Sequence, residues 1–414
     1  MDPGQAKLST MRKLLFVINT LSRAGAETAL LGLLRQLDPE LVEVDLFVLM
    51  SQGELASELP SYVKLLNKDY DNTSVLSRDG KRKLIKQVLR SAFARGTIIK
   101  LFPYLCRNLF DMLRRGSFNA KELLWRVLSD GAPRWDKEYD LAVAYLEGGA
   151  TYYVADHVKA AKKAAFVHTD YTMAGYTRKL DMDCYQEMEK IFAVSEEMRS
   201  LFLKVYPEHE HKTEVFYNIL DVSEIRRKSG LPGGFTDDYD GTRILTVGRL
   251  TALKAFDVSI DALKLLKDAG CRLRWYVLGE GEQRGKLEQK IRALGLTEDF
   301  ILCGAVDNPY PYLAKTDLYV HASRFEGKSI AIQEAQILGR PVLASDCSGN
   351  RENVSDGVDG KLCQLTPEGI RDGILWLLEH PEESRQYAEA AAQKYQNQAD
   401  GANKLLSLIG ENED

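Results

Sequence analysis

Short apolar segments alternate with segments of helical periodicity along this chain of 414 residues, and the alternation constrains the fold more than any other feature. Strands that alternate with helices are typical of a parallel sheet with helices on both faces. In the first half, the expected strands are Lys13–Ile18, Val44–Leu49, Leu141–Tyr145, Lys163–Val167 and Ile191–Val194, and a helix is expected at Glu27–Gln36. In the second half, the expected strands are Ile244–Val247, Arg274–Leu278, Ile301–Cys303, Leu318–His321 and Val342–Ser345, and the expected helices are Ala255–Ala269, Glu282–Ala293, Ser329–Leu338 and Pro367–Glu379.

A turn-rich segment between Tyr217 and Gly241 separates the two halves. It contains Leu-Pro-Gly-Gly from Leu231 and the acidic run Thr-Asp-Asp-Tyr-Asp-Gly from Thr236, both typical of loops. The chain length suits two domains of roughly 200 residues each. We therefore expect α/β domains over residues 1–216 and 217–414, with the last helix a candidate for packing back on the first domain.

Composition narrows the class of protein. The net charge of −5 and the pI of about 5.9 give no indication of nucleic-acid binding. The six cysteines form no C-x-x-C pair, which favours reduced thiols over a disulfide framework or a zinc site. No apolar run approaches the roughly 18 residues that a membrane span needs, and Leu14–Ile18 is too short for a signal peptide. These features favour a cytoplasmic protein, and residues 1–10 are interpreted as an extension before Met11.

The segment from Ser323 to Gly360 carries the strongest functional pattern. Glu326 follows an expected strand, and Glu334 lies inside the next expected helix. Between them, the helix N-terminus is formed by Gly327, Lys328, Ser329 and Ile330. Its free backbone N–H groups and positive dipole favour an anion such as phosphate. A carboxylate on either side of such a site suits the hydroxyl groups of a nucleoside diphosphate sugar.

This segment resembles the E-x7-E signature of retaining glycosyltransferases of family 4, of the kind that makes bacterial cell-surface polysaccharides. The flanking Gly-Arg-Pro-Val-Leu-Ala-Ser-Asp run from Gly339, then Gly349, Glu352 and the Asp-Gly-Val-Asp-Gly turn from Asp356, occur in the same order. The resemblance implies the GT-B fold, in which two doubly wound Rossmann-like domains face each other across a cleft. The first domain is then the acceptor domain and the second binds the nucleotide sugar.

The resemblance also implies further donor-site residues in the second domain. The Gly248-Arg249-Leu250 run ends a strand, and Lys254 follows it. Arg249 and Lys254 are expected to neutralise the leaving diphosphate, one through bidentate contacts and the other as a point charge. The turns that contain Gly279, Gly304 and Val306 are expected to approach the nucleotide.

In the first domain, Gly25-Ala26-Glu27 resembles the glycine-rich loop of the family, although Ala24 replaces the usual first glycine. The loop containing Gly25 and Ala26 is expected to offer N–H groups to a phosphate or an acceptor. His168 and Asp170 follow a strand at the position where relatives carry a residue that faces the donor sugar. Both are therefore candidate sugar-contacting residues.

No metal or other cofactor is expected. Asp181-Met-Asp183 has the spelling of a metal-binding D-x-D, but it precedes an expected helix and does not end a strand. The leaving diphosphate is then stabilised by Arg249, Lys254 and the helix N-terminus, which is electrostatic preorganisation.

A basic insert at about residues 76–130 stands out from the acidic chain. From Lys81 to Arg115, ten Lys or Arg residues face one acid, Asp111, with apolar and aromatic residues between them at helical spacing. This pattern is typical of a helix at a membrane surface. The alternative is a pair of helices that bury the apolar face against the domain and leave the charges in water.

These observations predict a retaining, metal-independent glycosyltransferase. It moves a sugar, most simply from a UDP-sugar, to a glycan or polyprenyl-linked saccharide in cell-surface or exopolysaccharide synthesis, at the inner face of the plasma membrane. Glu326 is assigned to the donor sugar and Glu334 to the ribose. The alternatives are a sugar-nucleotide epimerase of the same fold and a non-catalytic sugar-nucleotide binder.

Overall fold

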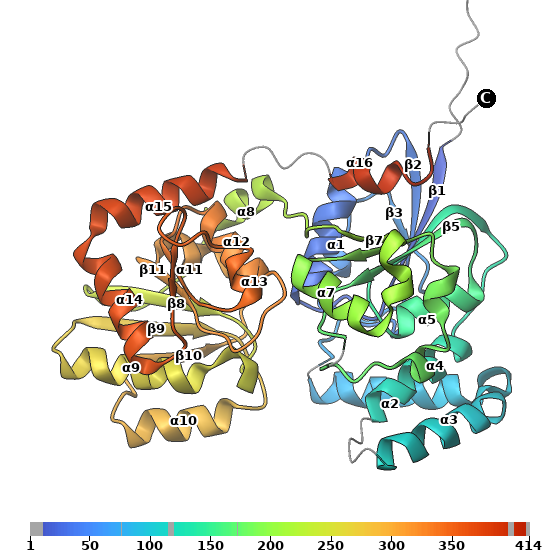
Figure 1. Cartoon of the computed structure of the whole chain (residues 1–414), viewed down its shortest axis with the longest axis horizontal. Helices are drawn as coiled ribbons and strands as arrows, with labels where there is room; N and C mark the ends of the chain where they lie inside the picture. The colour runs from blue at the N-terminus through green and yellow to red at the C-terminus, as the bar shows by residue number, and fades with distance from the viewer. Residues whose placement is uncertain (1–10, 76, 115–119, 172, 396–400, 411–414) are drawn as a thin grey trace, which may run out of the picture. The chain divides into compact units, whose positions relative to one another are not determined.

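The computed structural model describes residues 11–75, 77–114, 120–171, 173–395 and 401–410, and these form two compact units (Figure 1). The first unit comprises Met1–Leu220 and Ala399–Asp414, and the second comprises Asp221–Gln398. The division follows Leu220, four residues beyond the expected boundary, and the C-terminal segment belongs to the first unit. The expected extension at residues 1–10 lies outside the described residues, as do residues 76 and 115–119 of the basic insert.

The first unit contains a seven-stranded parallel sheet in the order β3-β2-β1-β4-β5-β6-β7. The strands are β1 Arg12–Ile18, β2 Val42–Val48, β3 Val63–Leu65, β4 Glu138–Ala144, β5 Lys159–Val167, β6 Lys190–Ala193 and β7 Thr213–Val215. The helices are α1 Gly25–Gln36, α2 Arg78–Phe93, α3 Thr97–Arg114, α4 Ala120–Gly131, α5 Gly149–His157, α6 Arg178–Asp181, α7 Glu196–Val205 and α16 Gly401–Leu406. The strand order runs outward from β1 in both directions, which is the doubly wound pattern.

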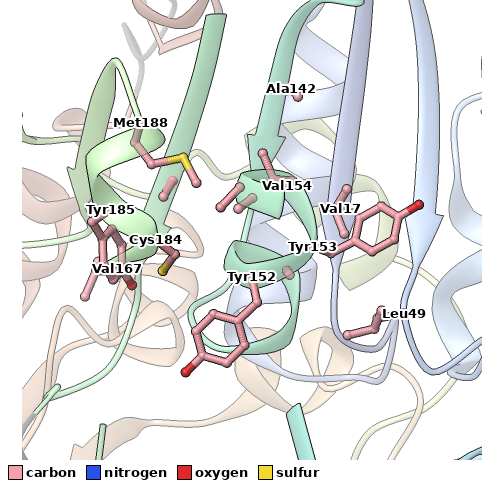
Figure 2. Close-up of a cluster of buried hydrophobic side chains, with 14 of the residues drawn as sticks. Val17, Leu49, Ala142, Tyr152, Tyr153, Val154, Val167, Cys184, Tyr185 and Met188 are labelled. Carbon is pink, nitrogen blue, oxygen red and sulfur yellow. The ribbon is translucent and has the colours of Figure 1, made fainter. Parts of the chain in front are cut away.

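The core of the first unit lies between the sheet and the helices that cover it. Figure 2 shows part of this core, where Val17 of β1 and Ala142 of β4 lie beside Val154 of α5. These three side chains are fully buried. The runs of apolar residues in β1 and β4 have no polar alternation because both faces of a parallel sheet are covered.

The C-terminal helix α16 packs against α1 within the first unit. Lys404 donates to the carbonyl oxygen of Val215 at 2.7 Å, and Arg12 donates to the carbonyl oxygen of Gly410 at 2.9 Å. The side chain of Ile219 occupies the space where a Cβ on Gly401 would lie. The last segment is thus held on the first unit by backbone-directed hydrogen bonds and close packing.

The second unit contains a six-stranded parallel sheet in the order β10-β9-β8-β11-β12-β13. Its strands are β8 Thr242–Val247, β9 Leu273–Leu278, β10 Phe300–Gly304, β11 Leu318–His321, β12 Val342–Ser345 and β13 Lys361–Cys363. Its helices are α8 Val222–Ser229, α9 Phe256–Asp268, α10 Arg284–Ala293, α11 Tyr310–Lys315, α12 Ile330–Ile337, α13 Ser348–Arg351, α14 Pro367–Glu379 and α15 Pro381–Gln393. The α/β class and the doubly wound topology predicted from the sequence are therefore confirmed in both units.

The prediction for the loop after β1 was wrong in one respect. Helix α1 begins at Gly25 and not at Glu27, because Ala24 has the extended backbone of an N-cap residue. Gly25 and Ala26 consequently lie in the first turn of the helix and not in the preceding loop. Their N–H groups still belong to the helix end that lacks intrahelical partners.

Candidate functional site

Glu326 forms the centre of a charged cluster at the carboxyl end of the second sheet. It follows β11, while Lys254 ends the short 3-10 helix Ala252–Lys254 that follows β8. Strands β8 and β11 are neighbours, so their ends bring the two side chains together. Lys254 Nζ forms an ion pair with Oε1 of Glu326, and Nε2 of His321 lies 2.8 Å from the same oxygen. Two residues predicted for the site, 72 positions apart in the chain, thus meet in the fold.

The surroundings of Glu326 keep its carboxylate charged. Burial by itself raises the pKa of Glu326, but the positive charge of Lys254 and the hydrogen bond from His321 outweigh burial and hold this pKa well below its usual range. The pKa of His321 is lowered, first by burial and then by Lys254. Glu326 is therefore an ionised acceptor with a fixed orientation.

His321 is a site residue that the sequence analysis missed. It is the last residue of β11 and is 1% exposed. Its Nδ1 lies 3.2 Å from the hydroxyl oxygen of Tyr319, and its Nε2 faces Glu326. The sequence signal that could have identified His321 was a histidine at the end of an apolar strand, five positions before Glu326.

The backbone between the two glutamates leads into α12. The helix begins at Ile330, with Ser329 as an N-cap residue whose side chain makes no capping hydrogen bond. The first N–H groups of the helix therefore have neither an intrahelical acceptor nor a capping side chain. Burial lowers the pKa of Lys328, which neighbours this turn. Of the four residues predicted to form the helix N-terminus, Ser329 and Ile330 lie at the helix start, while Gly327 and Lys328 precede it in a bend.

Gly349 packs directly against this turn. A Cβ on Gly349 would lie 1.8 Å from the carbonyl oxygen of Gly327 and 2.2 Å from that of Glu326. No side chain fits at that separation, so the start of α13 approaches the Glu326–Gly327 backbone only because residue 349 is glycine.

Glu334 lies deeper in the second unit than Glu326. It is 7% exposed, and the hydroxyl of Tyr310 donates to its Oε1 at 2.9 Å. Burial raises the pKa of Glu334 to about 7, although the hydrogen bond from Tyr310 and the charge of Lys228 act in the opposite direction. The two carboxylates of the pair thus differ in charge state because their surroundings differ.

Three glycines join the carboxyl ends of β8, β9 and β10. The N–H of Gly248 donates to the carbonyl oxygen of Leu278 at 3.0 Å, and that of Gly279 donates to the carbonyl oxygen of Gly304 at 2.8 Å. Gly279 has a φ of 156°, and a Cβ there would lie 1.9 Å from the carbonyl oxygen of Gly248. Val306 follows β10 in a loop and is partly buried. The three glycines therefore add no side chain of their own to these strand ends.

Arg249 follows Gly248 and is exposed. Its guanidinium makes no hydrogen bond or ion pair with any residue that the structure describes. Lys254, by contrast, is engaged with Glu326. Of the two cations predicted for a diphosphate, Arg249 is thus the one whose charge is unpaired in this part of the chain.

In the first unit, His168 follows the end of β5. Its backbone N–H donates to Oε2 of Glu147 at 3.0 Å, and its ring lies near those of Tyr145 and Phe166. Nε2 of His168 is buried and has no hydrogen-bond partner among the described residues. Burial lowers the pKa of His168 to about 3, so the ring is neutral. A buried nitrogen without a partner is unusual, and it marks His168 as a residue whose role the described hydrogen bonds do not explain.

Asp170 lies close to His168 but has a local partner. Its carboxylate accepts the backbone N–H of Met173 at 3.0 Å, and its carbonyl oxygen accepts that of Ala174 at 2.9 Å. This arrangement supports the turn that follows β5. Asp170 therefore has a visible structural role that the sequence analysis did not assign to it.

Asp181, the first residue of the D-x-D sequence, lies in the core of the first unit. Its carboxylate accepts hydrogen bonds from the hydroxyls of Tyr152 at 2.8 Å, Tyr206 at 2.6 Å and Tyr171. Arg126 donates to its carbonyl oxygen at 2.8 Å. Burial raises the pKa of Asp181 to about 6 despite these hydrogen bonds. The Asp181 carboxylate thus accepts hydrogen bonds from three tyrosines and stabilises the core of the first unit.

Comparison with known proteins finds similarity to glycosyltransferases. Residues 241–380 match the family model described as glycosyl transferases group 1, and they extend from the start of the second sheet through α14. The chain is 32% identical over 182 residues to the N-acetylgalactosamine-N,N'-diacetylbacillosaminyl-diphospho-undecaprenol 4-alpha-N-acetylgalactosaminyltransferase of Campylobacter jejuni, covering 44% of this chain and 48% of the relative. It is 26% identical over 239 residues to the amylovoran biosynthesis glycosyltransferase AmsD of Erwinia amylovora, covering 57% of this chain and 64% of the relative. The chain thus spans about half the length of the first relative and less than two thirds of the second.

The fold extends the similarity to the whole chain. The crystal structure of Anabaena HepE in complex with UDP is 18% identical and superposes with a TM-score of 0.63, covering 96% of this chain and 99% of that chain. Both sheets, with their parallel strands and intervening helices, therefore have the GT-B architecture. Residues 241–380 thus have the sequence pattern of group 1 glycosyl transferases, and the chain as a whole has the fold of the HepE structure, in agreement with the resemblance noted in the sequence.

Proposed function

We propose that this protein is a retaining, metal-independent glycosyltransferase that uses a UDP-sugar. The observation that carries the proposal is the ionised Glu326, held by Lys254 and His321 beside the uncapped N-terminus of α12. The helix end suits a diphosphate, as does Arg249, whose charge has no partner among the described residues, and Glu326 suits the hydroxyls of the attached sugar. The HepE structure contains UDP, which supports uracil as the base of the donor.

The proposed acceptor is a glycan or a polyprenyl-linked saccharide in cell-surface polysaccharide synthesis, at the cytoplasmic face of the plasma membrane. The names of the Campylobacter and Erwinia relatives support acceptors of this class. In the proposed reaction, the acceptor hydroxyl attacks the sugar carbon from the side that the diphosphate leaves, through an oxocarbenium-like state. The departing phosphate takes the acceptor proton, and Arg249 and the α12 N-terminus stabilise its negative charge.

The direct test incubates the protein with a panel of UDP-, GDP- and ADP-sugars, with and without a polyprenyl-diphosphate saccharide. Release of UDP together with a glycosylated acceptor supports the proposal. Conversion of the donor to its epimer without an acceptor supports an epimerase instead. Binding without turnover of any sugar nucleotide supports a non-catalytic binder.

Two variants separate the roles of the glutamates within this proposal. Glu334→Ala is expected to weaken binding of both UDP and the UDP-sugar, since Glu334 is assigned to the ribose. Glu326→Ala is expected to leave UDP affinity nearly unchanged and to depress transfer. Equal losses of UDP affinity in calorimetry would contradict this division of roles.

A further inference from the structure

The basic insert leaves a large apolar surface exposed on the first unit. Ten of the nineteen exposed large apolar side chains among the described residues lie between Ile85 and Leu124. Helices α2 and α3 lie at the end of the first unit opposite α16 and pack on α4 (Figure 1). Monomeric soluble proteins seldom leave such a cluster of large side chains uncovered, so the surface indicates an interaction site.

The side chains of helix α3 form three groups, or arcs, around its axis: buried, exposed apolar and cationic. One arc is buried on α4 and its neighbours through Leu101, Asn108 and Met112. The next arc is apolar and exposed, and it includes Ile99, Phe102, Phe110 and Leu113, which are 64–77% exposed. Helix α3 therefore carries more apolar surface than its packing inside the unit buries.

The third arc of α3 is a row of cations. Lys100, Arg107 and Arg114 follow one another at intervals of seven residues, which places them along one edge of the exposed apolar arc. All three are exposed and have no hydrogen bond or ion pair with any described residue. A row of cations beside an apolar arc is the pattern of a helix that lies in a membrane interface.

Helix α2 repeats the pattern on a smaller scale. Ile85, Leu89 and Phe93 recur at intervals of four and are 53–74% exposed. Lys86 and Arg90 lie beside them, are exposed, and have no hydrogen bond or ion pair within the described part of the chain. Lys83, in contrast, is paired with Asp71, so its charge is already compensated within the unit.

The insert is tied to the ligand-binding end of the first sheet. Trp125 of α4 lies beside the loop that follows β4, because a Cβ on Gly148 would approach its ring to 3.2 Å. Ligands of open α/β sheets bind at the carboxyl ends of the strands. Helix α4, on which α2 and α3 pack, thus reaches the end of the sheet where an acceptor is expected to bind.

We infer that the exposed surface of α2 and α3 docks on an anionic lipid bilayer. The apolar arc enters the interfacial region, and the cations beside it contact the lipid phosphates. The charge pattern favours a bilayer over a protein partner. The chain has a net charge of −5, yet cations are concentrated on α2 and α3, where they would attract anionic lipids. None of the described helices is long and apolar enough to cross a bilayer, and docking of this kind needs no spanning helix.

Sedimentation of the full chain with vesicles tests the inference. Without any nucleotide, the protein is expected to sediment with vesicles of phosphatidylcholine and phosphatidylglycerol, to bind vesicles of phosphatidylcholine alone weakly, and to be released by high salt. The result does not depend on transferase activity, so its failure and the failure of the proposed function are distinguishable. Lack of binding to anionic vesicles at low salt would overturn the inference.

Matched variants locate the surface. The charge variant K100Q/R107Q/R114Q is expected to lose roughly 100-fold in partitioning, at about fivefold per cation. Its control, K64Q/K204Q/K286Q, removes the same charge from exposed lysines outside the insert that have no partner among the described residues, and is expected to bind like wild type. Equal losses in both variants would show that only net charge matters and would overturn the assignment to α3.

The apolar arc has its own variant. I99Q/F102Q/F110Q is expected to lose on the order of tenfold or more in vesicle binding, while its control, L41Q/V358Q/L378Q, changes exposed apolar residues elsewhere and is expected to bind normally. Circular dichroism checks folding, which exposed positions should preserve. Sedimentation equilibrium tests whether the surface instead joins copies of the chain. If wild type dimerises, I99Q/F102Q/F110Q does not, and both bind vesicles equally, the surface is a dimer contact and the inference is overturned.

Discussion

His321 Nε2 lies 2.8 Å from Oε1 of Glu326, and this contact fixes the charged carboxylate at the end of β11. Because an ionised carboxylate only accepts hydrogen bonds, Nε2 carries the proton and donates it. Nδ1 is then the acceptor for the hydroxyl of Tyr319, 3.2 Å away. The neutral His321, itself fixed in a buried strand, thus holds Glu326 in position at the proposed sugar site.

His321 is expected to act as a positioning residue. His321→Leu removes the hydrogen bond to Glu326, and a hydrogen bond to a charged group is worth about 1.5–3 kcal/mol, so turnover should fall roughly 10- to 100-fold. His321→Gln retains an N–H at a similar distance from the backbone and should recover most of the loss. UDP affinity should change little in both variants. Equal turnover in the two variants, measured with the substrates that the sugar-nucleotide panel identifies, would remove His321 from this role.

Glu334 is expected to make stability depend on pH. Its pKa in the folded protein, about 7, is higher than in the unfolded chain. The folded state therefore binds the proton more tightly, and the resulting stability is fully present below about pH 4 and is lost as the pH rises through 7. Glu334→Gln keeps an acceptor for Tyr310 without the charge.

Urea denaturation at several pH values tests this expectation. Glu334→Gln should be more stable than wild type at pH 8, by up to about 3 kcal/mol, and the difference should shrink toward pH 5. Subtracting the two curves cancels other titrating groups such as Asp181 and His168. A difference that stays constant with pH would show that burial does not raise the Glu334 pKa.

Arg249 is expected to matter for nucleotide binding and not for folding. Since it is exposed and unpaired among the described residues, Arg249→Ala should change the free energy of unfolding by less than about 0.5 kcal/mol. Loss of a charged contact to the diphosphate should weaken UDP binding roughly 10- to 100-fold. Lys286→Ala, which removes another exposed cation of the second unit, is the control. If calorimetry gives both variants the affinity of wild type, Arg249 does not contact the diphosphate.

Gly349 is expected to tolerate no side chain. Gly349→Ala places a Cβ 1.8 Å from the carbonyl oxygen of Gly327, so the turn before α12 must move. Loss of both UDP binding and stability is expected, the latter by about 1–3 kcal/mol. Gly285→Ala, in the first turn of α10, is the matched control, because a Cβ there meets nothing within 4 Å. Similar effects of the two substitutions would contradict the packing argument.

The sequence predicted the strands of four or more residues in this fold and missed the strands of three residues. Strands β1 and β9 and helix α14 lie within one or two residues of their expected positions, because each has several apolar residues in one period. Strands β3, β7 and β13 have three residues each, too few for a period to be visible. They are recognised as strands only through pairing with longer neighbours in the sheet.

The features of the candidate site also divide into those that the sequence predicted and those that it did not. The sequence by itself determined the parallel α/β class, the glycines at the strand ends and the two acids around a helix N-terminus, because these depend on local periodicity and turn chemistry. Only the tertiary structure decided that His321 holds Glu326, that Glu334 titrates near neutrality and that Gly349 packs on Gly327. It also decided that the apolar arc of α3 stays uncovered. Pairing, burial and exposure depend on residues that are distant in the chain, and no local pattern of side chains records which of them will meet.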